Sequence, residues 1–313
     1  MRGKNKITQP ERFFSFSKYL KNTFGKKIYK LSFDGGMTCP NRDGKIGTSG
    51  CIFCSEGGSG DFAVSLNHGV DYAISLAKEK VANKTGENCG YIAYFQSYTN
   101  TYAPVSKLKE LFLPLINHNE IVALSIGTRP DCLDDEVISL IGELCKIKPV
   151  FVELGLQTIH ENTAKFIRRG YELNVFDKAV EKLNNVGAKI VVHLILGLPH
   201  ESEEMILESV SYLAKQKIHG VKLQLLHVLK NTDLATLYNQ GVFNTFTLNE
   251  YVKLVAKCVE LLPPNIVIHR LTGDAPKNIL IAPTWSANKK LVLNSITKYF
   301  NDNSIKQGNK FNN

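Results

Sequence analysis

No stretch of the 313-residue chain stays apolar over the roughly 20 residues that a transmembrane helix requires. The first residues, MRGKNKITQP, carry charge and lack the apolar segment of a secretory signal. A hydrophobic share of 43% and a mean hydropathy of −0.11 are ordinary values for a globular protein. These absences argue against a membrane partner and predict a cytoplasmic protein.

The sequence also lacks the cysteine pattern of a disulfide framework and the common hydrolase motifs. Its seven cysteines are an odd number, of which three cluster and four are scattered. No HExxH or GxSxG motif occurs, and the glycine-rich segment lacks the Lys-Ser or Lys-Thr pair of a phosphate-binding loop. The cysteines therefore indicate metal or redox chemistry in a reducing compartment.

Basic residues outnumber acidic ones and give a net charge of +9. This excess favours a polyanionic partner such as a nucleic acid, although many proteins are mildly basic. Residues 1–27 form a basic arm with an aromatic patch at Phe13, Phe14 and Phe16, and further lysines lie near the C-terminus. The last ten residues or so, polar and poor in apolar side chains, are expected to be disordered.

Apolar runs and helical patterns alternate six times along the chain, which predicts an α/β protein with a parallel sheet. A further short strand is expected near the end. The predicted strands are 27–33, 91–95, 121–126, 150–156, 189–196, 221–229 and 266–269. Six such units can form a doubly wound sheet or a partial barrel, and in both the ligands bind at the carboxyl ends of the strands. Polar and glycine-rich segments follow the first five strands, so they are expected to share one rim.

The segment from Leu31 to Asp61 contains the clustered cysteines Cys39, Cys51 and Cys54 and eight glycines. Glycine allows the backbone conformations that a loop needs to wrap three thiolates around one compact object. Three thiolates suit a [4Fe–4S] cluster with one open iron, whereas structural zinc requires four closed ligands. From spacing alone, an iron–sulfur cluster, a zinc site and incidental cysteines all remain open.

These cysteines, with five sequence motifs in order, resemble the YtqA/YhcC-like family of radical S-adenosylmethionine (SAM) enzymes. The long first cysteine gap is similar to that of the Elongator catalytic subunit. The resemblance extends from about residue 25 to 283. The motifs are TCPNRDG at 38–44, YFQSYTNTYAP at 94–104, GTRPDCL at 127–133, ELGLQT at 153–158 and HLILGLP at 193–199.

The resemblance implies a partial (β/α)6 radical SAM barrel over 28–265, with short extensions at 1–27 and 266–313. It implies that Cys39, Cys51 and Cys54 are the catalytic residues that hold a [4Fe–4S] cluster. SAM is then expected to bind the open iron and to be cleaved to a 5′-deoxyadenosyl radical. That chemistry belongs to the cofactor, and the protein orients it.

The resemblance also implies which residues contact SAM. Three of them also have a simpler structural interpretation: Gln157 could cap the next helix, Arg169 could lie on a solvated face, and His193 could be a buried core histidine. Phe53 is expected against the adenine, Arg169 at the carboxylate and His193 at the ribose. The complete predicted set is Phe53, Gln96, Ser97, Glu153, Gln157, Arg169, His193 and Gly197.

The substrate expected from the resemblance is tRNA, with the wobble uridine converted from a carboxymethylaminomethyl to an aminomethyl side chain. His269, Arg270 and Lys277 are candidates for the RNA path, and Tyr98, Tyr102 or Trp285 could stack on an extruded base. An external one-electron donor such as flavodoxin or ferredoxin is expected. Two alternatives are a radical SAM enzyme for a small metabolite or protein, and a non-catalytic zinc-binding RNA module.

Overall fold

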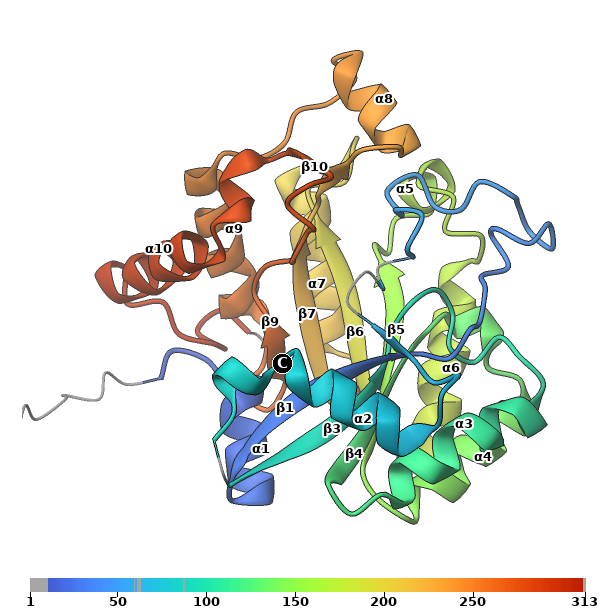
Figure 1. Ribbon diagram of the computed structural model, residues 1–313. Coiled ribbons are helices and arrows are strands. Elements are labelled where there is room, and N and C mark those ends of the chain that lie inside the picture. The colour runs from blue at the N-terminus through green and yellow to red at the C-terminus, as the bar shows by residue number, and fades with distance from the viewer. Residues whose placement is uncertain (1–10, 59, 61–62, 87, 312–313) are drawn as a thin grey trace, which may run out of the picture.

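The computed structural model describes residues 11–311 apart from 59, 61, 62 and 87. Eight parallel strands form one curled sheet in the order β2-β1-β3-β4-β5-β6-β7-β9 (Figure 1). These are β1 (Lys27–Asp34), β2 (Val64–Ser65), β3 (Cys89–Phe95), β4 (Ile121–Thr128), β5 (Val150–Gln157), β6 (Lys189–Leu196), β7 (Gly220–Leu225) and β9 (Val267–Arg270). The curled α/β sheet confirms the predicted partial barrel.

Helices cover the outer face of the sheet, and α8 lies beyond the strand ends at the top of Figure 1. The helices are α1 (Phe16–Phe24), α2 (Val70–Glu79), α3 (Val105–Asn117), α4 (Asp135–Cys145), α5 (Glu161–Phe166), α6 (Leu173–Asn185), α7 (Glu203–Ala214), α8 (Asp233–Asn239), α9 (Leu248–Leu261) and α10 (Lys289–Asp302). A short antiparallel pair, β8 (Val228–Leu229) with β10 (Leu280–Ala282), completes the fold. No helix in the described ranges has the length and apolar character needed to cross a bilayer.

The helix starts follow the capping signals in the sequence. The carboxylate of Asp134 accepts a hydrogen bond from the backbone N–H of Val137 (2.9 Å), and the Ser202 hydroxyl does the same for Met205 (3.3 Å). Both satisfy backbone donors that a helix leaves free in its first turn. These bonds fix the starts of α4 and α7.

Helix α1 packs against the inner face of the sheet at the amino ends of the strands. Leu20 is buried there with Ile92, Phe151 and other inward-facing side chains of β3 to β6. The segment before the helix also contacts β9, because the backbone N–H of Ile268 donates to Phe14 O (2.8 Å). Part of the predicted basic arm thus closes one end of the curled sheet, whereas residues 1–10 lie outside the described chain.

The C-terminal segment differs from the expected disordered tail, since residues 303–311 are held by specific hydrogen bonds. The Gln307 amide donates to Pro263 O (2.7 Å) and Ile266 O (2.8 Å), and it accepts from the backbone N–H of Phe14 (2.7 Å). Composition alone missed this anchoring because one buried glutamine, 5% exposed, provides it. A smaller difference concerns the predicted strand 221–229, which splits into β7 and β8.

Candidate functional site

The carboxyl ends of the strands and the loops after them surround one cavity of about 1730 Å³. Ligand pockets usually hold about 300–1,000 Å³, so this cavity has room for a cofactor and part of a substrate together. All but one of the predicted site residues line it. These are Cys39, Cys51, Phe53, Cys54, Gln96, Ser97, Glu153, Gln157, Arg169 and His193, and the exception is Gly197.

The loop after β1 carries the three cysteines and is held in shape by Arg42. The guanidinium of Arg42 donates to Cys54 O (3.1 Å) and Ser55 O (2.8 Å), which fixes the second half of the loop onto the first. Gly50 has a φ of +74°, and a Cβ there would lie 2.9 Å from Arg42 Nε. Glycine is therefore required at the point where the arginine crosses the loop.

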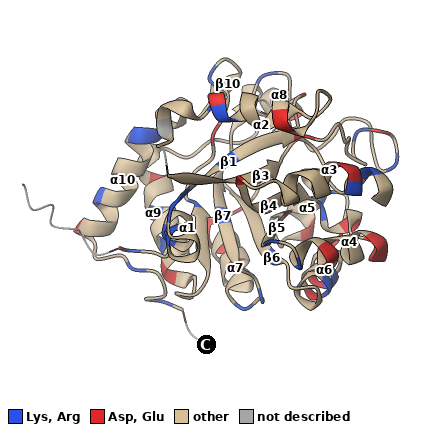
Figure 2. Cartoon of the chain, turned by 60° about the horizontal axis from the view of Figure 1, so that its bottom comes forward, with Lys and Arg blue, Asp and Glu red and all other residues tan. Residues whose placement is uncertain are grey.

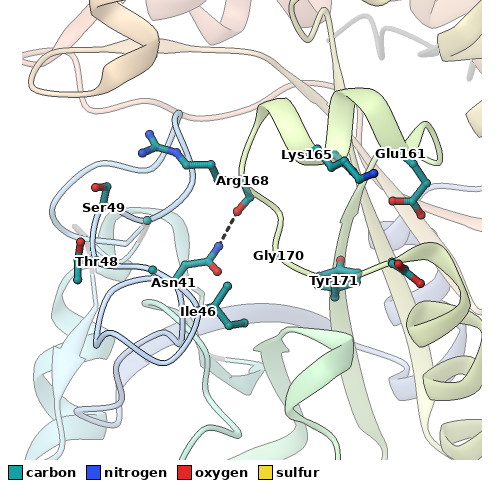
Figure 3. Close-up of a pocket in the computed structure, with 13 residues that line it drawn as sticks. Asn41, Ile46, Thr48, Ser49, Glu161, Lys165, Arg168, Gly170 and Tyr171 are labelled. Carbon is teal, nitrogen blue, oxygen red and sulfur yellow. Dashed lines mark hydrogen bonds between the residues drawn. The ribbon is translucent and has the colours of Figure 1, made fainter.

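Asn41 joins the cysteine loop to the turn that follows α5. Its Nδ2 donates to Arg168 O (2.7 Å), as the dashed line in Figure 3 shows, and also to Cys51 Sγ (3.3 Å). A second, smaller pocket of about 600 Å³ lies between loop residues 46–50 and this turn. The amide thus links one of the three thiols to the neighbouring turn after α5.

The charges around the thiols favour a thiolate at Cys51. A hydrogen bond from Cys54 lowers the pKa of Cys51 to about 7 against the effect of burial, and Arg129 and Arg168 act in the same direction. The pKa of Cys54 is raised because it donates that hydrogen bond and is buried. Thiolate is the form that binds metal, so the surroundings are suited to a metal ligand.

The three thiols lie on one short loop, line the same cavity and have cationic neighbours. Soft thiolate donors of this kind are the ligands of iron–sulfur clusters, and three of them leave one iron open for a small molecule. Within the part of the chain that the structure describes, no three His, Cys, Asp or Glu side chains converge on a single-ion site. The donor set therefore fits the [4Fe–4S] cluster that the sequence predicts.

Gln96 and Ser97 follow β3 in a tight turn beside the cysteine loop. Ser97 and Tyr98 both have positive φ values, +103° and +54°, which non-glycine residues seldom adopt. Backbone hydrogen bonds hold the turn in place, from Tyr98 N to Gly58 O (3.0 Å) and from Thr99 N to Thr38 O (3.2 Å). Such strained backbone is concentrated at functional sites, where the surrounding structure maintains it.

Gln157 and Arg169 shape the end of β5. With its amide nitrogen turned inward, Gln157 donates to Gly155 O (2.6 Å) and Leu156 O (2.9 Å), so it caps its own strand. The Arg169 guanidinium donates to Thr158 O (2.7 Å) and Tyr171 O (2.9 Å), and it is only 2% exposed. Arg169 is therefore not on a solvated face; it holds the loop that forms the cavity wall.

His193 and Glu153 meet inside the sheet. His193 Nε2 lies 2.9 Å from Glu153 Oε2, and its Nδ1 lies 3.2 Å from the amide nitrogen of Gln224. These partners place the proton on Nε2, because the amide can only donate to Nδ1. Glu153 also pairs with Lys30 (2.5 Å) and Lys222.

Phe53 lines the cavity, whereas Gly197 lies in the turn behind its wall. Phe53 packs against a small apolar cluster that includes Ile52, Leu198 and Leu226. Gly197 has a φ of +94°, and a Cβ there would lie 2.8 Å from the ring of Phe246. Gly197 therefore shapes the turn after β6 without lining the cavity.

Sequence reasoning did not find the residues that support this site. Arg42 and Asn41 act through contacts that form only when the chain folds, so no local pattern indicates them. Lys222 is different, since it is a charged residue within the apolar run of β7 and such a residue seldom lies in a sheet without a partner. That pattern was available in the sequence.

Comparison with family models matches residues 41–213 to the radical SAM superfamily and residues 218–302 to the radical SAM C-terminal domain. The uncharacterized protein YtqA of Bacillus subtilis (strain 168) is 40% identical over 301 residues, which cover 96% of this chain and 93% of that protein. The resemblance that the motifs indicate is thereby confirmed.

Two more distant proteins are similar to this chain, one in part of its sequence and one in its fold. A tRNA uridine(34) acetyltransferase of Methanocaldococcus jannaschii is 26% identical over 170 residues, which are 53% of this chain and 31% of that protein. The solved structure of Elp3 from Methanocaldococcus infernus superposes with a TM-score of 0.68 at 17% identity, over 90% of this chain and 64% of that one. At this low identity, the similarity to Elp3 shows a shared fold.

Proposed function

The chain belongs to the radical SAM superfamily, and on that premise we propose that it modifies the wobble uridine of tRNA, converting a carboxymethylaminomethyl to an aminomethyl side chain. It is a radical SAM enzyme, and its cofactors are a [4Fe–4S] cluster and SAM. When bound, these supply a 5′-deoxyadenosyl radical that takes a hydrogen atom from the substrate. The observation that carries the proposal is one cavity lined by both the three thiols and a set of cationic side chains.

In this proposal Cys39, Cys51 and Cys54 hold the cluster, and the surrounding walls hold SAM. The remaining wall residues bind or orient SAM, directly or through the loops that they fix, and the enclosing helices limit the access of water. These residues are Phe53, Gln96, Ser97, Glu153, Gln157, Arg169 and His193, and Gly197 shapes the adjoining turn after β6.

Four features support an RNA substrate. A distant relative is named as a tRNA uridine(34) acetyltransferase, and the chain carries a net charge of +9. Lys277 and Lys289 line the cavity. Figure 2 shows Lys and Arg positions along α10, whereas α4 carries Asp and Glu. Such a basic surface attracts the phosphate backbone.

An anticodon base that reaches this cavity has to leave its stack, as in other enzymes that modify bases. Tyr98 and Trp285 line the cavity and offer ring faces for stacking, whereas Tyr102 does not line it. The Trp285 ring is fixed by a hydrogen bond from Nε1 to Phe246 O (3.0 Å). We place the extruded uridine between these aromatic side chains and the thiols.

The electron for SAM cleavage comes, in this proposal, from a separate protein such as flavodoxin or ferredoxin. The two matched models cover residues 41–213 and 218–302, and neither describes an electron carrier.

The test is an anaerobic reconstitution with iron and sulfide, followed by dithionite, SAM and tRNA that carries the carboxymethylaminomethyl side chain. We expect a brown protein that forms 5′-deoxyadenosine and converts the tRNA. The variant with Cys39→Ala, Cys51→Ala and Cys54→Ala is expected to lose both activities. Cys145→Ala, which lies outside the cavity, serves as the matched control and keeps them.

Two results would replace the proposal with an alternative. If 5′-deoxyadenosine forms but tRNA is neither bound above nonspecific levels nor converted, the substrate is a metabolite or a protein. Binding to RNA that weakens steeply with salt distinguishes the two cases, because only a nucleic-acid partner releases counterions. A colourless, zinc-loaded protein that leaves SAM intact would indicate a non-catalytic RNA-binding module.

A further inference from the structure

The floor of the cavity contains a group of charged side chains that the cluster and its loop do not involve. Glu153 on β5 is fully buried, and it pairs with Lys30 on β1 (2.5 Å) and with Lys222 on β7. Both lysines line the cavity together with Arg270 of β9. Four strands, β1, β5, β7 and β9, thus each contribute one charged side chain to the floor of the cavity.

The positive charges on this floor outnumber the negative one. Glu153 is the single carboxylate between Lys30 and Lys222, whose side chains are 24% and 6% exposed. Both ammonium groups lie over the face of Tyr94, at 4.2 Å and 5.0 Å from the ring centroid. A ring face stabilises cations weakly and does not neutralise them.

Arg270 adds to this excess. Its guanidinium lies 3.4 Å from Asp274, but that carboxylate also pairs with Lys289 (2.7 Å). Burial and the like charges of Lys30 and Arg270 lower the pKa of Lys222 to about 7, although Glu153 acts in the opposite direction. Charge that is buried without a full counter-charge is costly, and a ligand that brings one negative charge removes that cost.

The floor is closed from below by apolar side chains. The ring of Phe16 in α1 lies 5.4 Å from Lys30 Nζ and packs edge-on against Phe151. An anion must therefore arrive from the cavity, which the thiols also line, as the end of a bound substrate. One extra positive charge shared by two ammonium groups matches a carboxylate, whose two oxygens can each accept a hydrogen bond from one of them.

We propose that Lys222 and Lys30, with Arg270 beside them, form a binding site for a carboxylate at the end of the substrate. Glu153 is the positioning residue that holds the two ammonium groups in place. The inference rests on the proposed function, since that function identifies the group as the carboxylate of the carboxymethylaminomethyl side chain. The site would then select substrate over product, because the aminomethyl product has lost that carboxylate.

The test compares two anticodon stem-loop RNAs that differ only in the wobble side chain, carboxymethylaminomethyl or aminomethyl. Their Kd values are measured by fluorescence anisotropy on the reconstituted holoenzyme without reductant, so that no turnover occurs. Wild-type protein is expected to bind the carboxylate RNA about tenfold more tightly, as one charged hydrogen-bonded pair allows. Lys222→Met and Lys30→Met are expected to bring this ratio close to one without changing the affinity for unmodified RNA.

Lys253→Met provides the matched control, because it removes the same charge from an exposed position on α9. It is expected to keep the wild-type ratio. If both floor variants keep that ratio while the wild type converts the RNA, the carboxylate site is wrong and the proposed function stands. If the wild type neither distinguishes the two RNAs nor converts the first, both fail. Should Lys222→Met not fold, the more exposed Lys30→Met decides.

Discussion

Single residues inside the curled sheet are held by charge as much as by packing. Burial alone would raise the pKa of Glu153, but the positive charges of Lys222 and Lys30 hold it well below its usual range. Ser125 Oγ adds a hydrogen bond to the same carboxylate (2.8 Å). The carboxylate is therefore ionised, and the two lysines depend on it.

Replacing Glu153 by Gln is expected to lower the free energy of unfolding by about 3 kcal/mol, because it leaves two lysines inside the sheet without a counter-charge. Urea denaturation of the reconstituted protein, followed by far-UV circular dichroism, measures the change.

Glu143→Gln is the matched control, since Glu143 pairs with Lys109 at the surface. The side chain of Glu143 is 50% exposed and that of Lys109 is 41% exposed. Surface pairs contribute about 0–1 kcal/mol, so little change is expected there. Equal small losses in the two variants would show that the floor charges do not stabilise the fold.

The residues that sequence reasoning found are those that share a local pattern. Cys51 and Cys54 are separated by two residues on a loop that follows a strand, and this spacing is visible without a structure. Arg42 and Asn41 lie within the same loop, but their roles arise from contacts with Cys54 O and Arg168 O that form on folding. Tertiary contacts of this kind leave no signal in a single sequence.

At the scale of elements, the two ends of the described chain are tied together by Gln307. Its side chain bonds the segment before α1 on one side and the turn between α9 and β9 on the other. The backbone N–H of Gln307 also donates to Arg12 O (2.9 Å). The C-terminal segment therefore holds α1 in its place under the sheet.

Gln307→Ala is expected to lower the free energy of unfolding by about 2 kcal/mol, because it leaves buried backbone groups without partners. Gln240→Ala, at an exposed position after α8, is the control and is expected to change it by less than about 0.5 kcal/mol. Thermal denaturation of both variants measures the difference. An unchanged midpoint for Gln307→Ala would mean that the segment adds no stability.

The long strands were predictable because they are apolar on both faces. β6 has the predicted bounds, and β4 and β5 extend only slightly beyond theirs. The two-residue strands β2 and β8 were not predictable, since two residues carry no periodicity. That α1 packs on the inner face of the sheet was not predictable, because its amphipathic pattern shows that one face is buried but not what covers it.

For the whole molecule, enclosed histidines couple stability to pH. Burial lowers the pKa of His193, His219 and His227 to about 4 each, and it lowers the pKa of His269 well below its usual value. In the unfolded chain their pKa is about 6.5, so below that pH the unfolded state binds protons first. The folded state is then lost more easily as the pH falls from about 6.5 to 4.

The free energy of unfolding is expected to fall by about 1–2 kcal/mol per histidine between pH 7 and pH 5. His219→Phe removes one of these histidines, among the rings of Tyr19 and Phe151, and is expected to make this decline shallower. His68→Gln, at an exposed position, is expected to leave it unchanged. Urea denaturation at several pH values measures the slopes, and equal slopes for wild type and His219→Phe would contradict the expectation.

The placement of α1 determines from which side of the sheet a ligand can enter the cavity. Because Phe16 and Leu20 pack against the inner face at the amino ends of the strands, a ligand reaches Lys30 and Lys222 from the carboxyl ends of the strands. The thiols and these lysines line the same cavity, so a ligand bound at the lysines occupies space beside the thiols. Replacing Phe16 by Ala would open a second approach to Lys30 from the amino ends.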